Sequence, residues 1–279
     1  MNINHYIENK HSKFIIIDGE DKKNFLQSII TNNIEKCTKN NLIYSCLLTP
    51  QGRFFADFFI SEHQNKYLIE IDKLYFESFF KKLLMYKLRS KVEISLQTNF
   101  HSFILFQELD FIKDKLTYLY KDPRNEKIGL KLYLDKESKN LKKLNELNKI
   151  DYESYRDLLM QNLIPNSTHD LSQNKSLLLE NNFENINAID WEKGCYVGQE
   201  LTARMKYRAL LKKKIYTLRI ISGKINIGDK LVNDEIEIGE IISKTDNYIL
   251  SMLKINLIKN ASSNKSVITT YEGAKVSFF

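Results

Sequence analysis

The chain has 279 residues, 43% of them hydrophobic, and is long enough to bury a substantial core. No apolar run approaches the roughly 20 residues of a membrane-spanning helix, and the first residues lack the pattern of a secretory signal peptide. The three cysteines show no Cys-x-x-Cys spacing, which argues against a disulfide framework and a zinc site. These features predict a cytoplasmic protein that makes no membrane contact.

The net charge of +7 originates in one part of the chain. No acidic residue occurs between Glu200 and Asp229, yet this segment holds eight lysines and arginines, and the rest of the chain is close to neutral. Such a block attracts anions, either a nucleic-acid backbone or the carboxylates of a small ligand. The alternative interpretation is a solvated face with no ligand.

The first hundred residues mix strand and helix patterns. Strands are expected at 13–18, 67–71, 91–97 and 102–107, and helices at 21–30 and 74–89. A hairpin is expected from strands 42–49 and 53–61, joined by the turn Pro50-Gln51-Gly52. The order lacks the regular alternation of a parallel sheet, which predicts an α+β layer.

The rest of the chain changes character after Lys212. Before it, a strand is expected at 128–135, a polar helix or surface connection at 136–149, and a helix at 151–162 that ends ahead of Pro165. After it, short β-rich runs alternate with glycines and polar turns, at 215–221, 230–232, 236–243, 248–253 and 267–270. This pattern predicts a C-terminal domain at 209–279 built as a small antiparallel barrel or sandwich.

Several familiar chemistries have no motif here. There is no G-x-S-x-G elbow, Walker loop or G-x-G-x-x-G turn, and the histidines form no H-x-x-x-H pair. Cys37 and Cys46 fall in apolar patterns and are expected to be buried as small hydrophobic side chains. Trp191 is expected to fill the core rather than to stack on a ligand.

Cys195 differs because its neighbours bear on its acidity. It lies in a glycine-punctuated stretch just ahead of an expected helix at 199–208, whose N-terminal N–H groups carry partial positive charge. Lys193 adds a full charge nearby, and both effects favour the reactive thiolate. A purely structural cysteine is the alternative.

The string Lys193-Gly194-Cys195-Tyr196-Val197-Gly198-Gln199-Glu200 resembles the signature K-G-C-Y-x-G-Q-E of the YgfZ family of folate-binding proteins, which includes mitochondrial iron-sulfur assembly factors. Further segments are similar in the same order: Phe25-Leu26-Gln27, Thr31-Asn32, Leu47–Arg53, Tyr155-Arg156, Ile164-Pro165, Arg204 and Lys206-Tyr207-Arg208. The resemblance implies the fold of the aminomethyltransferase (glycine cleavage T-protein) superfamily. Folate-binding α+β domains, here at 1–208 as two interleaved subdomains, would surround a central hole and precede the β-barrel.

The resemblance implies a tetrahydrofolate-binding factor that helps to build or repair iron-sulfur clusters and supports iron-sulfur enzymes that modify tRNA. Cys195 would act transiently, or share a cluster with a partner protein or a second copy of the chain, since clusters usually take four thiolates. Lys193 would hold it as thiolate. The residues expected to bind folate or shape its loop are Gly194, Tyr196, Gly198, Gln199, Glu200, Arg204, Lys206, Arg208, Gln51 and Arg53. Basic residues among them would bind the glutamate tail.

Two rival functions remain. A folate-dependent one-carbon transferase would require the acid pair that its relatives carry after the hairpin, where this chain has Ala56-Asp57. An RNA-binding module would use residues 204–224, although no RNA-binding motif supports it. Ala209 departs from the family pattern, in which glycine commonly follows the arginine.

Overall fold

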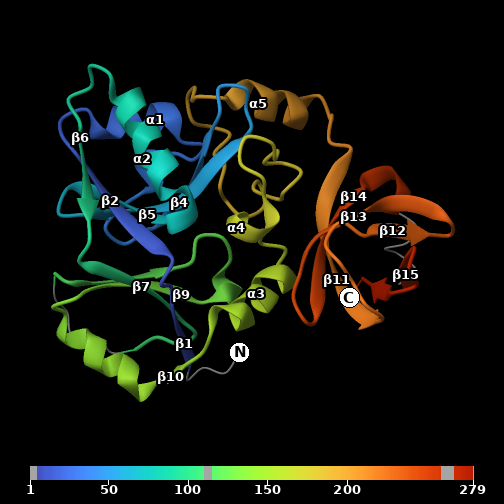
Figure 1. Cartoon of the computed structure of the whole chain (residues 1–279). Helices are drawn as coiled ribbons and strands as arrows, with labels where there is room; N and C mark the ends of the chain where they lie inside the picture. Colours follow the sequence, from blue (N-terminus) through green and yellow to red (C-terminus); the bar gives the residue numbers. More distant parts are fainter. Residues whose placement is uncertain (1–4, 110–114, 259–266, 279) are drawn as a thin grey trace.

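The computed structural model describes residues 5–109, 115–258 and 267–278 of the chain. They form two five-stranded sheets and a closed barrel, with the barrel beside the two sheets (Figure 1). No helix within these residues is long and apolar enough to cross a membrane.

The first sheet contains the predicted hairpin. Its order is β3 (Ile43–Leu48), β4 (Phe54–His63), β5 (Lys66–Asp72), β2 (Ser12–Asp18) and β6 (Glu93–Gln97), all antiparallel. Helix α2 (Lys73–Lys87) packs on β2, β4 and β5, and α1 (Lys22–Ile29) follows β2. The hairpin prediction is confirmed, with Ile43 opposite Ile60 in the register.

The second sheet was predicted only in part. Its order is β10 (Asn148–Lys149), β1 (His5–Glu8), β7 (Phe100–Leu105), β9 (Leu130–Asp135) and β8 (Thr117–Lys121). Strands β7 and β9 were expected, whereas β1, β8 and β10 were not. The stretch left open between helix and connection contains a 3-10 helix, η3 (Lys139–Glu146). Shorter 3-10 turns are η1 (Ile34–Lys36) and η2 (Glu126–Ile128).

The two sheets share one hydrophobic core. Phe14 of β2 meets Tyr133 of β9 edge-to-face, with ring centroids 5.4 Å apart. A buried ion pair also joins the sheets, because Lys131 Nζ of β9 lies 2.5 Å from Glu70 Oε2 of β5. Both side chains are only 3% exposed.

The barrel has the predicted C-terminal strands. In order around it run β11 (Lys213–Ser222), β14 (Tyr248–Lys254), β13 (Ile236–Lys244), β12 (Lys230–Asn233), β15 (Val267–Thr270) and β16 (Lys275–Ser277). Neighbouring strands are antiparallel, and Leu218, Ile241 and Ile249 lie in the barrel's own core. The barrel prediction is therefore confirmed, although β16 was not foreseen.

Two helices connect the sheets to the barrel. The predicted helix is confirmed as α3 (Tyr152–Gln161), and a short α4 (Ser167–Asp170) follows Pro165. Thr217 Oγ1 of β11 donates to Met160 O at 2.6 Å, and Ser243 Oγ of β13 donates to Asp170 Oδ1 at 2.5 Å. The barrel thus rests directly on α3 and α4.

Candidate functional site

The loop that carries Cys195 precedes helix α5 (Gln199–Tyr207) and exposes the cysteine. Cys37 and Cys46 are buried, as predicted. Nothing lies within 4 Å of a Cβ built on Gly194, so the surface beside the thiol is open. The Cys195 sulfur is therefore accessible to a partner molecule.

The ammonium group of Lys193 points to helix α1 and not to Cys195, whose thiolate it was expected to stabilise. Its ammonium donates to Gln27 O at 2.8 Å, Ile30 O at 2.5 Å and Asn32 O at 3.0 Å, at the C-terminal end of α1. Three bonds use all three ammonium protons, so none remains for a Cys195 thiolate. Burial lowers the pKa of Lys193 to about 8, against the nearby Asp190 carboxylate, which raises it. The geometry makes Lys193 a cap of α1 rather than the partner of the thiolate.

Gly198 joins the signature loop to the hairpin turn. Its φ of +80° is the left-handed conformation that glycine adopts without strain. A Cβ at this position would lie 2.3 Å from Thr49 O, and a Cβ at Gly52 would lie 2.8 Å from Gly198 O. Two of the segments that carry the family resemblance, the signature loop and the hairpin turn, thus meet backbone to backbone although they are far apart in the chain.

The remaining loop residues mostly bond to one another. Gln199 Oε1 accepts from Tyr196 N–H at 3.2 Å, and Glu200 pairs with Arg204 one helical turn later at 3.4 Å. The Lys193 ammonium lies 4.9 Å from the centre of the Tyr196 ring. The side chain of Gln199 therefore fixes the turn into α5.

The predicted anion-binding residues lie on the surface around α5. Lys206 forms an ion pair with Glu184 and lies 5.5 Å from the Trp191 ring centre. Arg53 donates to Lys175 O at 3.0 Å, whereas Arg208 and Gln51 are exposed. Trp191 is partly buried and packs against the core.

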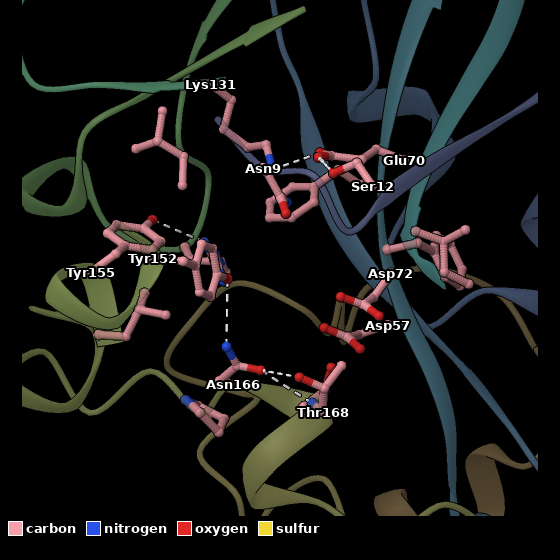
Figure 2. Close-up of a pocket in the computed structure, with 18 residues that line it drawn as sticks. Asn9, Ser12, Asp57, Glu70, Asp72, Lys131, Tyr152, Tyr155, Asn166 and Thr168 are labelled. Atoms are coloured by element: carbon pink, nitrogen blue, oxygen red, sulfur yellow. Dashed lines mark hydrogen bonds and ion pairs between the residues drawn. The ribbon is translucent and has the colours of Figure 1, made fainter. Parts of the chain in front are cut away.

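A cavity lies between the two sheets, beside α3 and α4 (Figure 2). Its walls come from β4, β5 and β9 and from both helices, and its polar lining residues are Asn9, Ser12, Asp57, Glu70, Asp72, Arg124, Lys131, Tyr152, Tyr155, Asn166, Ser167 and Thr168. Neither Cys195 nor any residue predicted to bind folate lines it. The structure separates the predicted loop from the central cavity because α5 lies on the surface.

Two carboxylates, Asp57 and Asp72, point into this cavity side by side (Figure 2). Tyr44 OH donates to Asp57 Oδ2 at 2.6 Å, and Leu74 N–H donates to Asp72 Oδ1 at 2.8 Å. Asp57 Oδ1 is buried, and the described part of the chain gives it no hydrogen-bond partner. Burial raises the pKa of each carboxyl group, and the charge of Asp57 raises that of Asp72 further.

The opposite wall is basic but internally paired. Glu70 pairs with Lys131 and also accepts from Ser12 Oγ at 2.5 Å. Arg124 forms a two-pronged pair with Asp122, and its guanidinium carbon lies 4.9 Å from the Phe59 ring centre. Asp57 Oδ1, by contrast, is a buried acceptor without a hydrogen bond from the described residues.

The free volume of the cavity is about 60 Å³. Sites for small molecules usually measure roughly 300–1,000 Å³, so a ligand larger than a few waters requires side chains to move. Within the described ranges, no group of three His, Cys, Asp or Glu side chains is arranged to hold a metal ion.

The acidic residues of the cavity have only a weak signal in the sequence. Asp57 interrupts the apolar run at 54–60 of β4, and a charged residue is rarely fully buried unless it has a partner. In the sequence, Asp57 stands out only by its place after the hairpin. Asp72 and Lys131 line the same cavity only because the two sheets pack together. The spacing of residues along the sequence does not predict that packing.

A solved structure shares this architecture. No family model matches the chain. A glycine cleavage system aminomethyltransferase T from Bartonella henselae superposes with a TM-score of 0.76, over 98% of this chain and 83% of that one, at 11% sequence identity. The chain has the T-protein fold. This confirms the predicted fold class, a T-protein-like α+β region with a C-terminal antiparallel barrel.

The sequence relatives of this T-protein-like chain are named iron-sulfur cluster assembly factors. It is 30% identical over 226 residues to the mitochondrial iron-sulfur cluster assembly factor IBA57 homolog of Mycosarcoma maydis, covering 75% of the chain and 55% of that protein. The Mus musculus IBA57 is 27% identical over 228 residues, covering 73% and 63%. The match spans little more than half the length of these relatives.

These names overturn one prediction. The relatives from Mycosarcoma maydis, Mus musculus and Homo sapiens are all named mitochondrial, which contradicts the cytoplasmic location expected from cysteine usage and the N-terminal sequence. Unpaired cysteines are typical of every reducing compartment, so they do not distinguish the cytoplasm from the others. The finer assignment to the YgfZ family stays a prediction.

Proposed function

We propose that the protein supports the assembly or repair of iron-sulfur clusters through Cys195 and binds a reduced folate in its central cavity. The exposed thiol on the signature loop carries the proposal. Relatives named as iron-sulfur cluster assembly factors support it. The cluster is cargo here, held by Cys195 together with ligands from a partner protein, because Cys37 and Cys46 are buried and clusters usually take four thiolates.

The cavity supports the folate half of the proposal. The pyrimidine edge of a reduced folate carries adjacent N–H donors, which suit the free oxygen of Asp57 and the neighbouring carboxyl group of Asp72. Charge-assisted bonds to a carboxylate are about twice as strong as neutral ones. Because the free volume is only about 60 Å³, binding includes a widening of the cavity. The client proteins in this proposal include iron-sulfur enzymes that modify tRNA.

A second candidate is one-carbon transfer on folate. Asp57 lines the cavity, and successive strand residues face opposite sides of a sheet, so Ala56 points away from it. The alanine therefore does not deprive the cavity of its carboxylate. A buried carboxyl group with a raised pKa is also suited to proton transfer. Direct RNA binding by residues 204–224 is the third candidate and has less support, because Lys206 and Arg204 already pair with carboxylates.

The test separates the two halves of the proposal. Tetrahydrofolate is titrated into the wild-type protein, Asp57→Asn and Cys195→Ser, and each variant is introduced into cells that lack the native protein. We expect Asp57→Asn to weaken folate binding by about tenfold or more. Cys195→Ser should keep folate binding and lose rescue of iron-sulfur enzyme activity.

Each half has its own contrary result. Rescue by Cys195→Ser removes the thiol from the function, and unchanged folate affinity in Asp57→Asn removes the cavity as the folate site. Turnover of an aminomethyl donor with tetrahydrofolate by the purified protein favours the transferase instead.

A further inference from the structure

A second pocket lies where the chain leaves α5 and enters the barrel. It measures about 520 Å³ and is lined by Leu211, Lys212, Lys213, Lys254, Ile255 and Asn256. Ile255 N–H donates to Lys212 O at 3.0 Å, so the two segments that form the pocket are bonded to each other. Its lining combines aliphatic side chains with lysines and includes no carboxylate.

The lysines of this pocket form no close ion pair with the described residues, although Lys254 Nζ donates to Glu237 O at 3.0 Å. Lys213 is also near enough to Glu180 and Glu240 for its charge to favour the ionised form of each. Lys213 and Lys254 are direct partners across β11 and β14, and like charges in that relation destabilise a sheet. No carboxylate of the described residues forms an ion pair with Lys212, Lys213 or Lys254, and the nearby Glu240 pairs with Lys230. An anionic ligand would relieve this repulsion.

Exposed apolar side chains continue the surface beyond the pocket. Tyr207 at the end of α5 is 72% exposed and Leu210 is 47% exposed. Aromatic and aliphatic groups surrounded by a charged rim are the usual composition of protein interfaces. The Trp191 ring packs 6.0 Å from that of Tyr207, which anchors the end of α5 to the segment before the Cys195 loop.

We propose that this pocket docks an acidic, amphipathic segment of a partner protein. An apolar side chain of that segment enters between Leu211 and Ile255, and its carboxylates pair with the surrounding lysines. Single-stranded nucleic acid fits less well, because its bases stack on aromatic rings and the pocket lining is aliphatic. The proposal goes beyond the iron-sulfur function, since it requires neither Cys195 nor folate.

The experiment uses the full chain and a fluorescein-labelled synthetic peptide in which glutamates alternate with leucine and phenylalanine. Binding is followed by fluorescence anisotropy at low and physiological salt. Lys212→Glu is compared with Lys142→Glu, a control with the same change in net charge at an exposed position of η3, which lies at the far end of the molecule from the barrel (Figure 1).

We expect saturable binding that Lys212→Glu weakens by about fivefold to tenfold and Lys142→Glu leaves within about twofold. Replacing the apolar residues of the peptide with serine should weaken binding at least tenfold, because the apolar contacts with Leu211 and Ile255 are lost. Lys213→Gln is the second variant should Lys212→Glu prove misfolded by circular dichroism.

Three results would overturn the proposal. They are the absence of saturable peptide binding, an equal loss in Lys142→Glu, and tighter binding of a labelled oligouridine than of the peptide. A Cys195→Ser protein should bind the peptide normally, which separates this proposal from the iron-sulfur function.

Discussion

The Lys193 side chain links the signature loop to helix α1 through three carbonyl oxygens. We predict that Lys193→Met lowers the free energy of unfolding by about 2–3 kcal/mol, because buried carbonyls lose a charged donor. Chemical denaturation measures this loss, with Cys195→Ser as the control of unchanged stability. If Lys193 instead serves the thiolate, its removal will leave stability unchanged and slow the alkylation of Cys195.

The backbone of Ala209 is strained, because alanine stands where the family pattern commonly has glycine. Its φ is +50°, in the left-handed region that costs a residue with a Cβ roughly 1 kcal/mol. Ala209→Gly should therefore raise the free energy of unfolding by up to about 1 kcal/mol, partly offset by the greater chain entropy of glycine. A lower melting temperature in thermal unfolding would contradict this account.

Among individual residues, the sequence predicted positions better than roles. The signature string pointed to Cys195, and its exposure agrees with a reactive group rather than a buried one. The role of Lys193 could not be predicted, because its partners at residues 27, 30 and 32 come close only after the loop folds onto α1. A neighbour in sequence is not always the partner in space.

At the scale of the elements, the signature loop contains two glycines with different surroundings. Gly198 packs against the hairpin turn, whereas Gly194 is open. Gly198→Ala should cost more than about 2 kcal/mol, since its Cβ would collide with Thr49 O and its φ is positive. Gly194→Ala should change stability by less than about 0.5 kcal/mol, because nothing lies within 4 Å of its Cβ. Thermal unfolding of the two variants measures this difference. Similar melting temperatures for both would contradict close packing of Gly198 against the hairpin turn.

The elements that the sequence missed are those with weak local patterns. Strands β1 and β10 are short, and β10 has only exposed residues, so it shows no apolar alternation. Strands β3 and β4 were predictable because apolar runs flank a Pro-Gln-Gly turn. The second sheet depends on pairing between distant segments more than on propensity.

At the scale of the whole molecule, the buried His63 marks the meeting of the two sheets. It lies on β4, and its ring centroid is 3.6 Å from that of Tyr118 on β8 and 5.9 Å from that of Phe100 on β7. Burial lowers the pKa of His63 from 6.5 to about 4. The folded protein therefore binds fewer protons than the unfolded chain between these two pH values.

Stability should consequently fall with acidification. The contribution of His63 is fully present above pH 6.5 and disappears as the pH falls toward 4, by about 3 kcal/mol in total. Urea unfolding at pH 7 and pH 4.5 measures the change, and His63→Gln, which keeps a donor for Ser61, should show a smaller one. An unchanged pH dependence in the variant would assign the acid sensitivity to other groups.

The central cavity was the feature least accessible from sequence. Its lining residues run from Asn9 to Thr168 and belong to both sheets and two helices. The resemblance implied a hole, but it placed folate contacts on the loop and the basic segment, which lie elsewhere. A contiguous motif can be read directly, whereas a cavity assembled from distant segments requires the fold.

The seating of the barrel on α3 and α4 has one more consequence. The same two helices contribute Tyr152, Tyr155, Asn166 and Thr168 to the cavity wall. A ligand that widens the cavity on this side displaces these helices, and with them Met160 and Asp170, where the barrel is hydrogen-bonded. We therefore expect ligand binding in the cavity to be coupled to the stability of the contact between the barrel and these helices.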